Sequence, residues 1–305
     1  MRTRALDVSD PDGPLVIEPI ADAATATLDR AQLIALFERH GVLLFRGFDL
    51  TPQNLVAFTD RFAEQYAPDA AWREARFGQK QIRTVNTGAL PIPLHSEASF
   101  AAAWPEIIFF YCSVPPSRGG ATTICDGVKL LQRLSLKTQR LFTSRPVKYE
   151  IALEGRKTAA GGDVEWPMLA PGVSGIWDRT NGIYRLSVIR NAVHETRYRS
   201  SSGSATYSFC NGAMIGSNHS EIKRISFADG EPIADDVLAE LAKAGEEVTL
   251  EISWQPRDLL MIDNWRFMHG RRAFDADDVR DISIVQVLRA SFGFGATTRG
   301  MVADT

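Results

Sequence analysis

The sequence predicts a mainly β protein with flanking helices, whose core is a double-stranded β-helix, or jelly roll. The first observation is that the C-terminal half carries short β-rich runs joined by turns, at residues 248–254, 259–263 and 280–287. The second is that two further runs, residues 106–112 and 121–125, are separated by a segment rich in Pro and Gly. Short turns suit antiparallel strands, whereas a parallel sheet would need the alternating βαβ pattern that these segments lack.

The N-terminal part predicts a helix, a buried strand and a second helix. Residues 31–40 place apolar side chains near one helical face, and Gly41 is typical of a helix end. The continuous apolar run 42–45 is short enough for a strand that is buried on both faces. Thr51 can cap the next helix, and Pro52 suits its first position. The buried face of this second helix is expected to consist of Leu55, Phe58 and Phe62.

Two more helices and one more strand are expected further along the chain. Asp126 can cap a helix that covers residues 128–142, with its leucines inside. Residues 146–153 favour a strand. A helix over residues 235–244 is expected to end at Gly245.

Length and charge limit the class of protein. A chain of 305 residues can bury one large core, and we expect a single domain over residues 1–305. Within it, residues 154–220 are rich in Gly, Ser and Arg and have few clear periods, so we expect an insertion or lid there. The 34 basic and 37 acidic residues form no basic block, which argues against binding to nucleic acid or an anionic membrane. The expected partner is a small molecule.

The cysteines indicate the compartment. Cys112, Cys125 and Cys210 are odd in number, widely spaced and without a C-x-x-C pair. Neither a disulfide framework nor a thiolate zinc site is therefore expected. We see no export signal and no apolar stretch long enough for a membrane span, so a reducing cytoplasm is the expected location.

The tripeptide His95-Ser96-Glu97 puts an imidazole and a carboxylate two residues apart. In an extended chain both side chains would point the same way. Joined by His269, they would make the 2-His-1-carboxylate face of non-haem Fe(II) oxygenases. The same tripeptide recurs at residues 219–221, but there it follows a small and polar run typical of a loop. We therefore assign the metal to the first copy.

Four motifs in this order resemble the TauD/TfdA superfamily of Fe(II)/2-oxoglutarate dioxygenases, over about residues 30 to 290. The motifs are Gly41 to Phe48, His95-Ser96-Glu97, Gly119-Gly120-Ala121-Thr122, and Asp263-Asn264 through His269-Gly270-Arg271 to Arg280. Glutamate at position 97, where many relatives have aspartate, is similar to the clavaminate-synthase-like and SyrP-like members. Those members commonly modify amino acids or natural products derived from amino acids.

The resemblance implies a role for each matching residue. His95, Glu97 and His269 match the metal ligands, Arg280 matches the arginine that binds the distal carboxylate of 2-oxoglutarate, and Thr122 matches the hydroxyl that assists it. A planar guanidinium suits this role because it can give a carboxylate two charge-assisted hydrogen bonds. The alternative carboxylate binders are Arg272 and Arg289.

The implied reaction uses Fe(II), 2-oxoglutarate and O2. Oxidative decarboxylation of 2-oxoglutarate to succinate and CO2 would drive attack on an unactivated C–H bond of an amino acid or an amino-acid-derived intermediate, free or tethered to a carrier. Hydroxylation is the leading outcome, while desaturation or cyclisation needs the same cofactors. Two other classes stay open: a zinc hydrolase, which could also use two histidines and a glutamate, and a non-catalytic jelly-roll binding protein.

Substrate contacts are the least constrained prediction. Asn86, Ser99 and Arg83 lie close in sequence to the metal motif, where a pocket wall could use them. Further candidates are Trp104, and Arg179 or Arg190 in the poorly patterned region.

Overall fold

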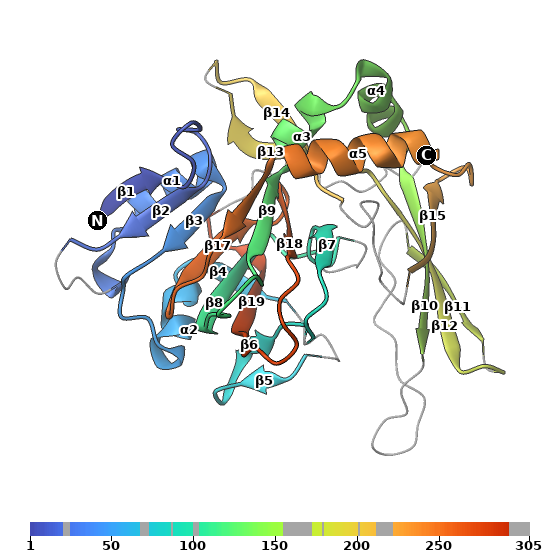
Figure 1. The fold of residues 1–305 in the computed structure, drawn as a ribbon. Helices are drawn as coiled ribbons and strands as arrows, with labels where there is room; N and C mark the ends of the chain where they lie inside the picture. Colours follow the sequence, from blue (N-terminus) through green and yellow to red (C-terminus); the bar gives the residue numbers. More distant parts are fainter. Residues whose placement is uncertain are drawn as a thin grey trace.

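The computed structural model describes residues 1–20, 25–67, 73–86, 88–99, 104–154, 173–178, 180–200, 202–211 and 222–292. These residues form two sheets that face each other, a third sheet beside them, a small hairpin and five α-helices (Figure 1).

The larger of the two facing sheets has the strand order β1-β2-β3-β17-β8-β19-β6-β5, and β4 also pairs with β19. Its neighbours are antiparallel except for β2 and β3, which are parallel. The strands are β1 Arg2–Ala5, β2 Leu15–Glu18, β3 Val42–Phe45, β4 Ala63–Tyr66, β5 Ala75–Arg76, β6 Gln79–Thr84, β8 Ile107–Val114, β17 Leu259–Asp263 and β19 Asp281–Ala290.

The smaller facing sheet has the order β16-β9-β18-β7. Its strands are β16 Thr249–Ile252, β9 Thr122–Asp126, β18 Phe267–Arg271 and β7 Ile92–His95. Along β8 the side chains alternate: Ile108 and Phe110 pack with Ile124 and Phe267 of the smaller sheet, whereas Ile107 belongs to the core on the other face. The two facing sheets form the double-stranded β-helix that the sequence predicts, and the fold prediction is confirmed.

The outer face of the larger sheet is covered by α1 (Arg30–His40) and α2 (Pro52–Asp60), so this sheet is buried on both sides. The Asp29 side chain caps α1 by accepting from the Gln32 N–H at 2.7 Å. Gly41 ends α1 with a φ of 68°, and a Cβ there would collide with the Phe267 ring. The predicted helix, buried strand and second helix are all found. Phe62 is buried as expected, but it follows α2 instead of lying on its face, because α2 ends at Asp60.

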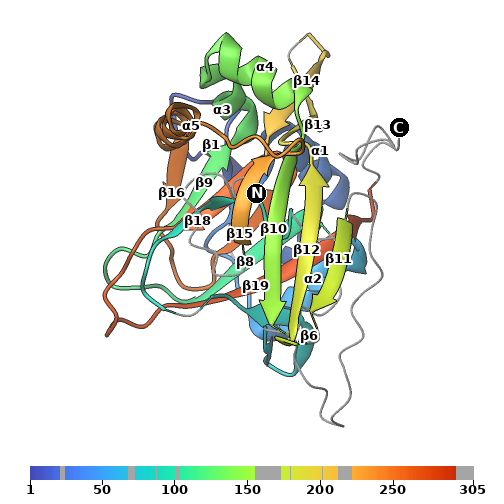
Figure 2. The same cartoon turned by 90° about the vertical axis from the view of Figure 1, so that its right-hand side faces the viewer.

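A third sheet lies to one side of the jelly roll and faces the viewer in Figure 2. It has the order β11-β12-β10-β15, and a two-stranded hairpin, β13-β14, stands apart from it. These strands are β10 Val147–Glu154, β11 Val173–Asp178, β12 Ile183–Arg190, β13 Val193–Arg199, β14 Ala205–Phe209 and β15 Ile222–Phe227. The described part of residues 154–220 is therefore largely β-structure, and its role as an insertion or lid stays a prediction.

Two helix boundaries differ from the sequence prediction. The helix expected over residues 128–142 is two helices, α3 (Gly127–Arg133) and α4 (Leu136–Ser144). They are separate because Leu134 is extended and the Ser135 hydroxyl caps α4 by accepting from the Thr138 N–H. The expected stop at Gly245 is also wrong, since α5 (Asp235–Glu247) continues through it. Gly245 is buried in the last turn, where packing outweighs a helix-propensity cost of about 1 kcal/mol.

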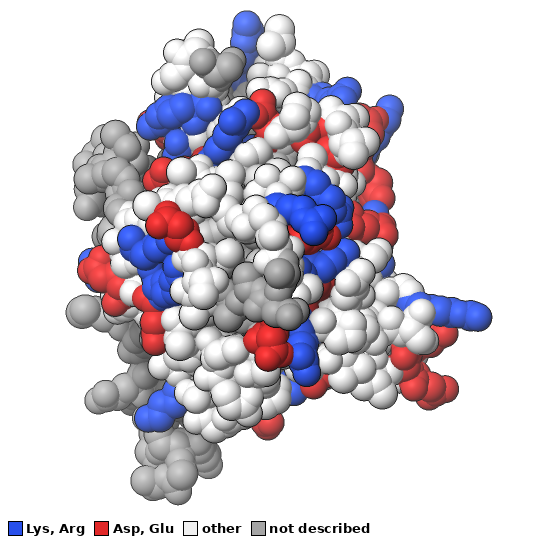
Figure 3. Space-filling view, turned by 90° about the vertical axis from the view of Figure 1, so that its left-hand side faces the viewer, with Lys and Arg blue, Asp and Glu red and all other residues white. Residues whose placement is uncertain are grey.

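The surface is mixed in charge on the face shown in Figure 3, where basic and acidic side chains are interspersed. Among the described helices, none is long and apolar enough to cross a membrane.

Candidate metal centre

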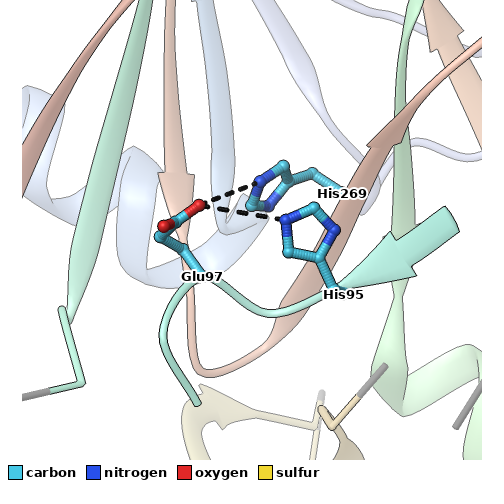
Figure 4. A group of neighbouring side chains, drawn as sticks. All are labelled: His95, Glu97 and His269. Carbon is cyan, nitrogen blue, oxygen red and sulfur yellow. Dashed lines mark ion pairs between the residues drawn. The ribbon is translucent and has the colours of Figure 1, made fainter. Parts of the chain in front are cut away.

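Three potential metal ligands converge between the two facing sheets. His95 ends β7 and is the register partner of His269 on the neighbouring strand β18. The Oε2 atom of Glu97 lies 3.8 Å from His95 Nε2 and 3.7 Å from His269 Nε2 (Figure 4). One ligand atom from each residue lies within 4.8 Å of the others, so a single ion could contact all three.

The route by which Glu97 reaches this point differs from the sequence prediction. The sequence predicts that His95 and Glu97 both lie on one extended strand. In the structure β7 ends at His95, and Glu97 lies in the turn that follows. The next residue, Ala98, has a φ of 54°, a left-handed conformation that is uncommon for alanine. The turn, rather than strand alternation, brings the carboxylate beside the imidazoles.

Asn264 holds this turn in place from the loop after β17. Its Oδ1 accepts from the Glu97 N–H at 2.9 Å, and its Nδ2 donates to the Glu97 carbonyl at 3.0 Å. The Ser96 hydroxyl donates to the Asn264 carbonyl at 2.6 Å. Asn264 is fully buried, so these bonds fix the backbone on both sides of the carboxylate. The sequence motif contained Asn264, but its role was not foreseen.

The Nε2 atoms of both imidazoles face the Glu97 carboxylate. Nδ1 of His95 lies 2.9 Å from the Pro93 carbonyl, which can only accept, so Nδ1 carries the proton and Nε2 is unprotonated in the neutral ring. His269 is buried and packs edge-to-face on Phe110. Burial, reinforced by His95, holds the pKa of His269 well below its ordinary value, so this ring is neutral at pH 7.

Arg73 is the contact that sequence reasoning missed. Its guanidinium donates to Glu97 Oε1 at 2.8 Å from the segment before β5. Burial alone would raise the pKa of Glu97, but Arg73 and the two imidazoles outweigh burial and hold that pKa below its usual range. Glu97 is thus a carboxylate at neutral pH. Two imidazoles and a carboxylate oxygen that converge on one point fit a divalent cation.

Arg280 and Thr122 lie beside each other, as the sequence predicts. The Arg280 Nε donates to the Gly120 carbonyl at 2.9 Å, and its Nη2 donates to Thr122 Oγ1 at 3.1 Å. The Trp254 indole also donates to Thr122 Oγ1, at 3.0 Å. Because that oxygen accepts twice, the Thr122 proton is free for an acceptor such as a carboxylate.

The Arg280 guanidinium is a cation without a bonded carboxylate among the described residues. Burial, with a contribution from nearby Arg271, lowers its pKa to about 10, so Arg280 stays charged at neutral pH. The Arg271 guanidinium likewise bonds no carboxylate among the described residues. It donates to the backbone carbonyls of Asn86, Gly88 and Leu90. Two cations in such a setting favour an anionic ligand.

A cavity of about 40 Å³, the inner cavity, connects the metal cluster to Arg280. A second cavity of about 450 Å³, the outer cavity, shares Arg271 and Arg280 with it. The inner cavity is lined by Arg73, Val85, Asn86, Ile92, His95, Glu97, Phe110, Thr122, His269, Gly270, Arg271, Arg280 and Ile282.

The other predicted residues fall into three groups. Asn86 lines both cavities, whereas Ser99 and Arg83 line neither: Ser99 is buried in the turn after Glu97, and Arg83 donates to the Arg73 carbonyl. Their role as substrate contacts stays a prediction. The alternative carboxylate binders are engaged elsewhere, Arg272 with Glu246 and Glu251, and Arg289 with Gln65 and Glu64. Trp104 and Arg190 line neither cavity, and residues 179 and 219–221 lie outside the described residues.

Comparison with known proteins gives consistent matches. The model of the Taurine catabolism dioxygenase TauD, TfdA family matches residues 17–287. A clavaminate synthase-like protein of Arabidopsis thaliana is 25% identical over 277 residues, covering 82% of this chain and 83% of that protein. The dapdiamide synthesis protein DdaC of Enterobacter agglomerans is 23% identical over 301 residues, covering 88% and 91%.

Among solved structures, PvcB from Pseudomonas aeruginosa aligns with a TM-score of 0.59 and 19% identity, over 94% of this chain and 91% of that chain. PvcB is described as an Fe, alpha-ketoglutarate dependent oxygenase from an isonitrile synthetic pathway. At this identity the likeness establishes a shared fold.

Proposed function

Because the chain belongs to the TauD, TfdA family of dioxygenases, we propose that it is an Fe(II)- and 2-oxoglutarate-dependent oxygenase. His95, Glu97 and His269 would hold the iron. The observation that carries this proposal is that three ligand atoms within 4.8 Å of one another line the same cavity as the Arg280 guanidinium, which bonds only neutral groups among the described residues. The fold of PvcB supports the same conclusion.

Bound iron and 2-oxoglutarate would supply the oxidising chemistry, in which the keto acid and O2 become succinate, CO2 and an oxidised substrate. The protein's part is to bind, orient and exclude water. Arg280 binds the distal carboxylate with charge-assisted hydrogen bonds, and the Thr122 hydroxyl donates a further one. The Arg280 Nε donates to the Gly120 carbonyl, and this bond fixes the orientation of the guanidinium for binding a carboxylate.

We further propose that the oxidised substrate is an amino acid or an intermediate derived from one, free or tethered to a carrier, and that the reaction is hydroxylation. Relatives named for clavaminate synthase likeness and dapdiamide synthesis support this substrate class. Glu97 would supply the third protein ligand to the metal, so the site would lack the vacancy that related halogenases keep for chloride. Desaturation or cyclisation would use the same residues.

The two alternative classes are less well supported. A zinc hydrolase needs an activated water on the metal but has no use for a paired Arg280 and Thr122. A binding protein without catalysis has no need for three converging ligands.

Succinate release separates these classes. Purified protein with Fe(II), 2-oxoglutarate and O2 is screened against amino acids, free and carrier-bound, and substrate-stimulated succinate is quantified. Stimulation by one group of substrates is the expected result. Hydrolysis by a zinc-loaded protein, with no succinate from any candidate, would contradict the proposal.

The expected location is a reducing compartment such as the cytoplasm. All three cysteines are buried as free thiols, which supports this expectation.

A further inference from the structure

Arg73 divides the two oxygens of Glu97 between two partners. Oε1 accepts from the Arg73 guanidinium at 2.8 Å, whereas Oε2 faces both imidazoles at 3.7 and 3.8 Å. The side chains of Arg73 and Glu97 are only 13% and 12% exposed. The bond is charge-assisted and shielded from water, so it is stronger than a surface ion pair.

This division matters because a glutamate can bind a cation through one oxygen or through both. An octahedral ion with three single-atom protein ligands keeps about three positions for exogenous ligands. If both oxygens of Glu97 bound the ion, one of those positions would be lost. A device that keeps Oε1 away from the ion therefore controls how many ligands the site can accept.

We propose that Arg73 is a positioning residue that holds Oε1, so that Glu97 binds the metal through Oε2 alone. This inference rests on the proposed function, because it takes the three converging residues to be metal ligands. It concerns the geometry of the site, independently of which substrate is oxidised.

The surroundings of the pair support this role. Among the described residues, no other side chain donates to Oε1, and no other carboxylate contacts the Arg73 guanidinium. Its Nη1 is buried and has no hydrogen-bond partner within the described part of the chain. Arg73 also lines the inner cavity, so its guanidinium lies beside the space where further metal ligands would enter. Removing it would leave Oε1 free to turn toward the ion.

The test counts the water molecules on a bound metal. Mn(II) alone is added to the protein without 2-oxoglutarate, and water-proton relaxation is measured for the bound ion. Three variants are compared with the wild type: Arg73→Met, which removes every donor, Arg73→Lys, which keeps one, and Arg4→Met. The last is a matched control, since Arg4 forms an exposed ion pair with Glu18 far from the cavity.

We expect Arg73→Met to lower the relaxivity of bound Mn(II) by roughly one third, as the bound waters fall from about three to about two. Arg73→Lys should restore most of the loss, and Arg4→Met should match the wild type. An unchanged relaxivity in Arg73→Met, with Mn(II) bound, overturns the inference and leaves the proposed function standing. Failure of the wild type to bind Mn(II) at all would instead count against the proposed function.

A second measurement covers the case in which Arg73→Met does not fold. Infrared difference spectra of the wild type, with and without Mn(II), report the separation of the two carboxylate stretching bands. We expect the wide separation of a carboxylate bound through one oxygen. The narrow separation of a carboxylate bound through both oxygens would overturn the inference.

Discussion

The two ends of the inner cavity differ in how their charges are balanced. At the metal end, the Glu97 carboxylate is paired with Arg73, and Asn264 fixes the Glu97 backbone. At the opposite end, Arg271 and Arg280 are cations whose bonded partners among the described residues are neutral groups. The metal end, with His95, Glu97 and His269, therefore suits a cation. The other end, with Arg271 and Arg280, supplies hydrogen-bond donors and suits an anion. A ligand with a metal-binding keto acid at one end and a carboxylate at the other would satisfy both.

The largest expected effect comes from removing one of the three proposed metal ligands, the His95 imidazole. His95→Ala should abolish succinate formation and weaken Fe(II) binding by more than the roughly 10–100-fold typical of changes outside the ligands themselves. His219→Ala, in the second copy of the tripeptide, should leave metal binding nearly intact. Metal stoichiometry by elemental analysis decides, and iron retained in His95→Ala but lost in His219→Ala would reverse the assignment.

Binding of 2-oxoglutarate should depend on the planar shape of the Arg280 guanidinium as well as on its charge. Arg280→Lys keeps the charge but loses the fork, so we expect a loss of roughly 1.5–3 kcal/mol, or about ten- to a hundredfold in 2-oxoglutarate affinity. Fe(II) affinity should change little. Arg272→Lys is the matched control, because Arg272 is bonded to two surface glutamates. Anaerobic titration checks both, and a neutral Arg280→Lys beside an impaired Arg272→Lys would move the anion site.

His194 is a buried histidine outside the cavity, and it should make the stability of the fold depend on pH. Burial lowers the pKa of His194, which packs against Trp104, to about 4. The unfolded chain then binds more protons, so stability present above about pH 6.5 is lost as the pH falls. Because of this histidine, the free energy of unfolding should fall by about 2 kcal/mol between pH 7 and pH 5. His194→Asn should abolish this part of the pH dependence. Urea unfolding at the two pH values measures it, and an undiminished difference in the variant would exclude His194 as its source.

The smallest expected effect concerns the hydroxyl at the anion end. Thr122→Val should weaken 2-oxoglutarate binding by about 0.5–1.5 kcal/mol, because one neutral hydrogen bond is lost. The variant should also be less stable, since the Trp254 indole loses its acceptor. Thr122→Ser should retain most of the affinity. Thr123→Val, on the next position of β9, serves as the control in the same titration, and an equal loss in both would refute a specific role for Thr122.

The residues that the sequence analysis expected to converge are local or belong to a motif, and their binding roles stay a prediction. His95 and Glu97 are two residues apart, and His269, Thr122 and Arg280 fall in motifs with recognisable spacing. The structure brings all five together in one cavity. The buried strand at residues 42–45, the strands from residue 106 to 125 and the C-terminal strands were also predictable, as were the first two helices, because apolar runs, periodicity and caps are local signals.

The remaining features depend on contacts between distant segments. Arg73 lies 24 residues before Glu97, and no local pattern marks it as its partner. Asn264 reaches the metal turn across 167 residues. Gly245 continues a helix where local propensity predicts an end, because buried packing overrides propensity. Three-dimensional proximity, rather than residue type, assigns these roles.

The central claim is that both ends of the inner cavity serve one metal and one keto acid. The most direct test is the weak visible absorption band of a keto acid chelated to Fe(II), recorded anaerobically at saturating iron. The wild type should show the band with 2-oxoglutarate, Arg280→Lys should need a roughly ten- to hundredfold higher concentration of 2-oxoglutarate, and His95→Ala should show none. A wild type without the band, or a His95→Ala variant that retains it, would contradict the account.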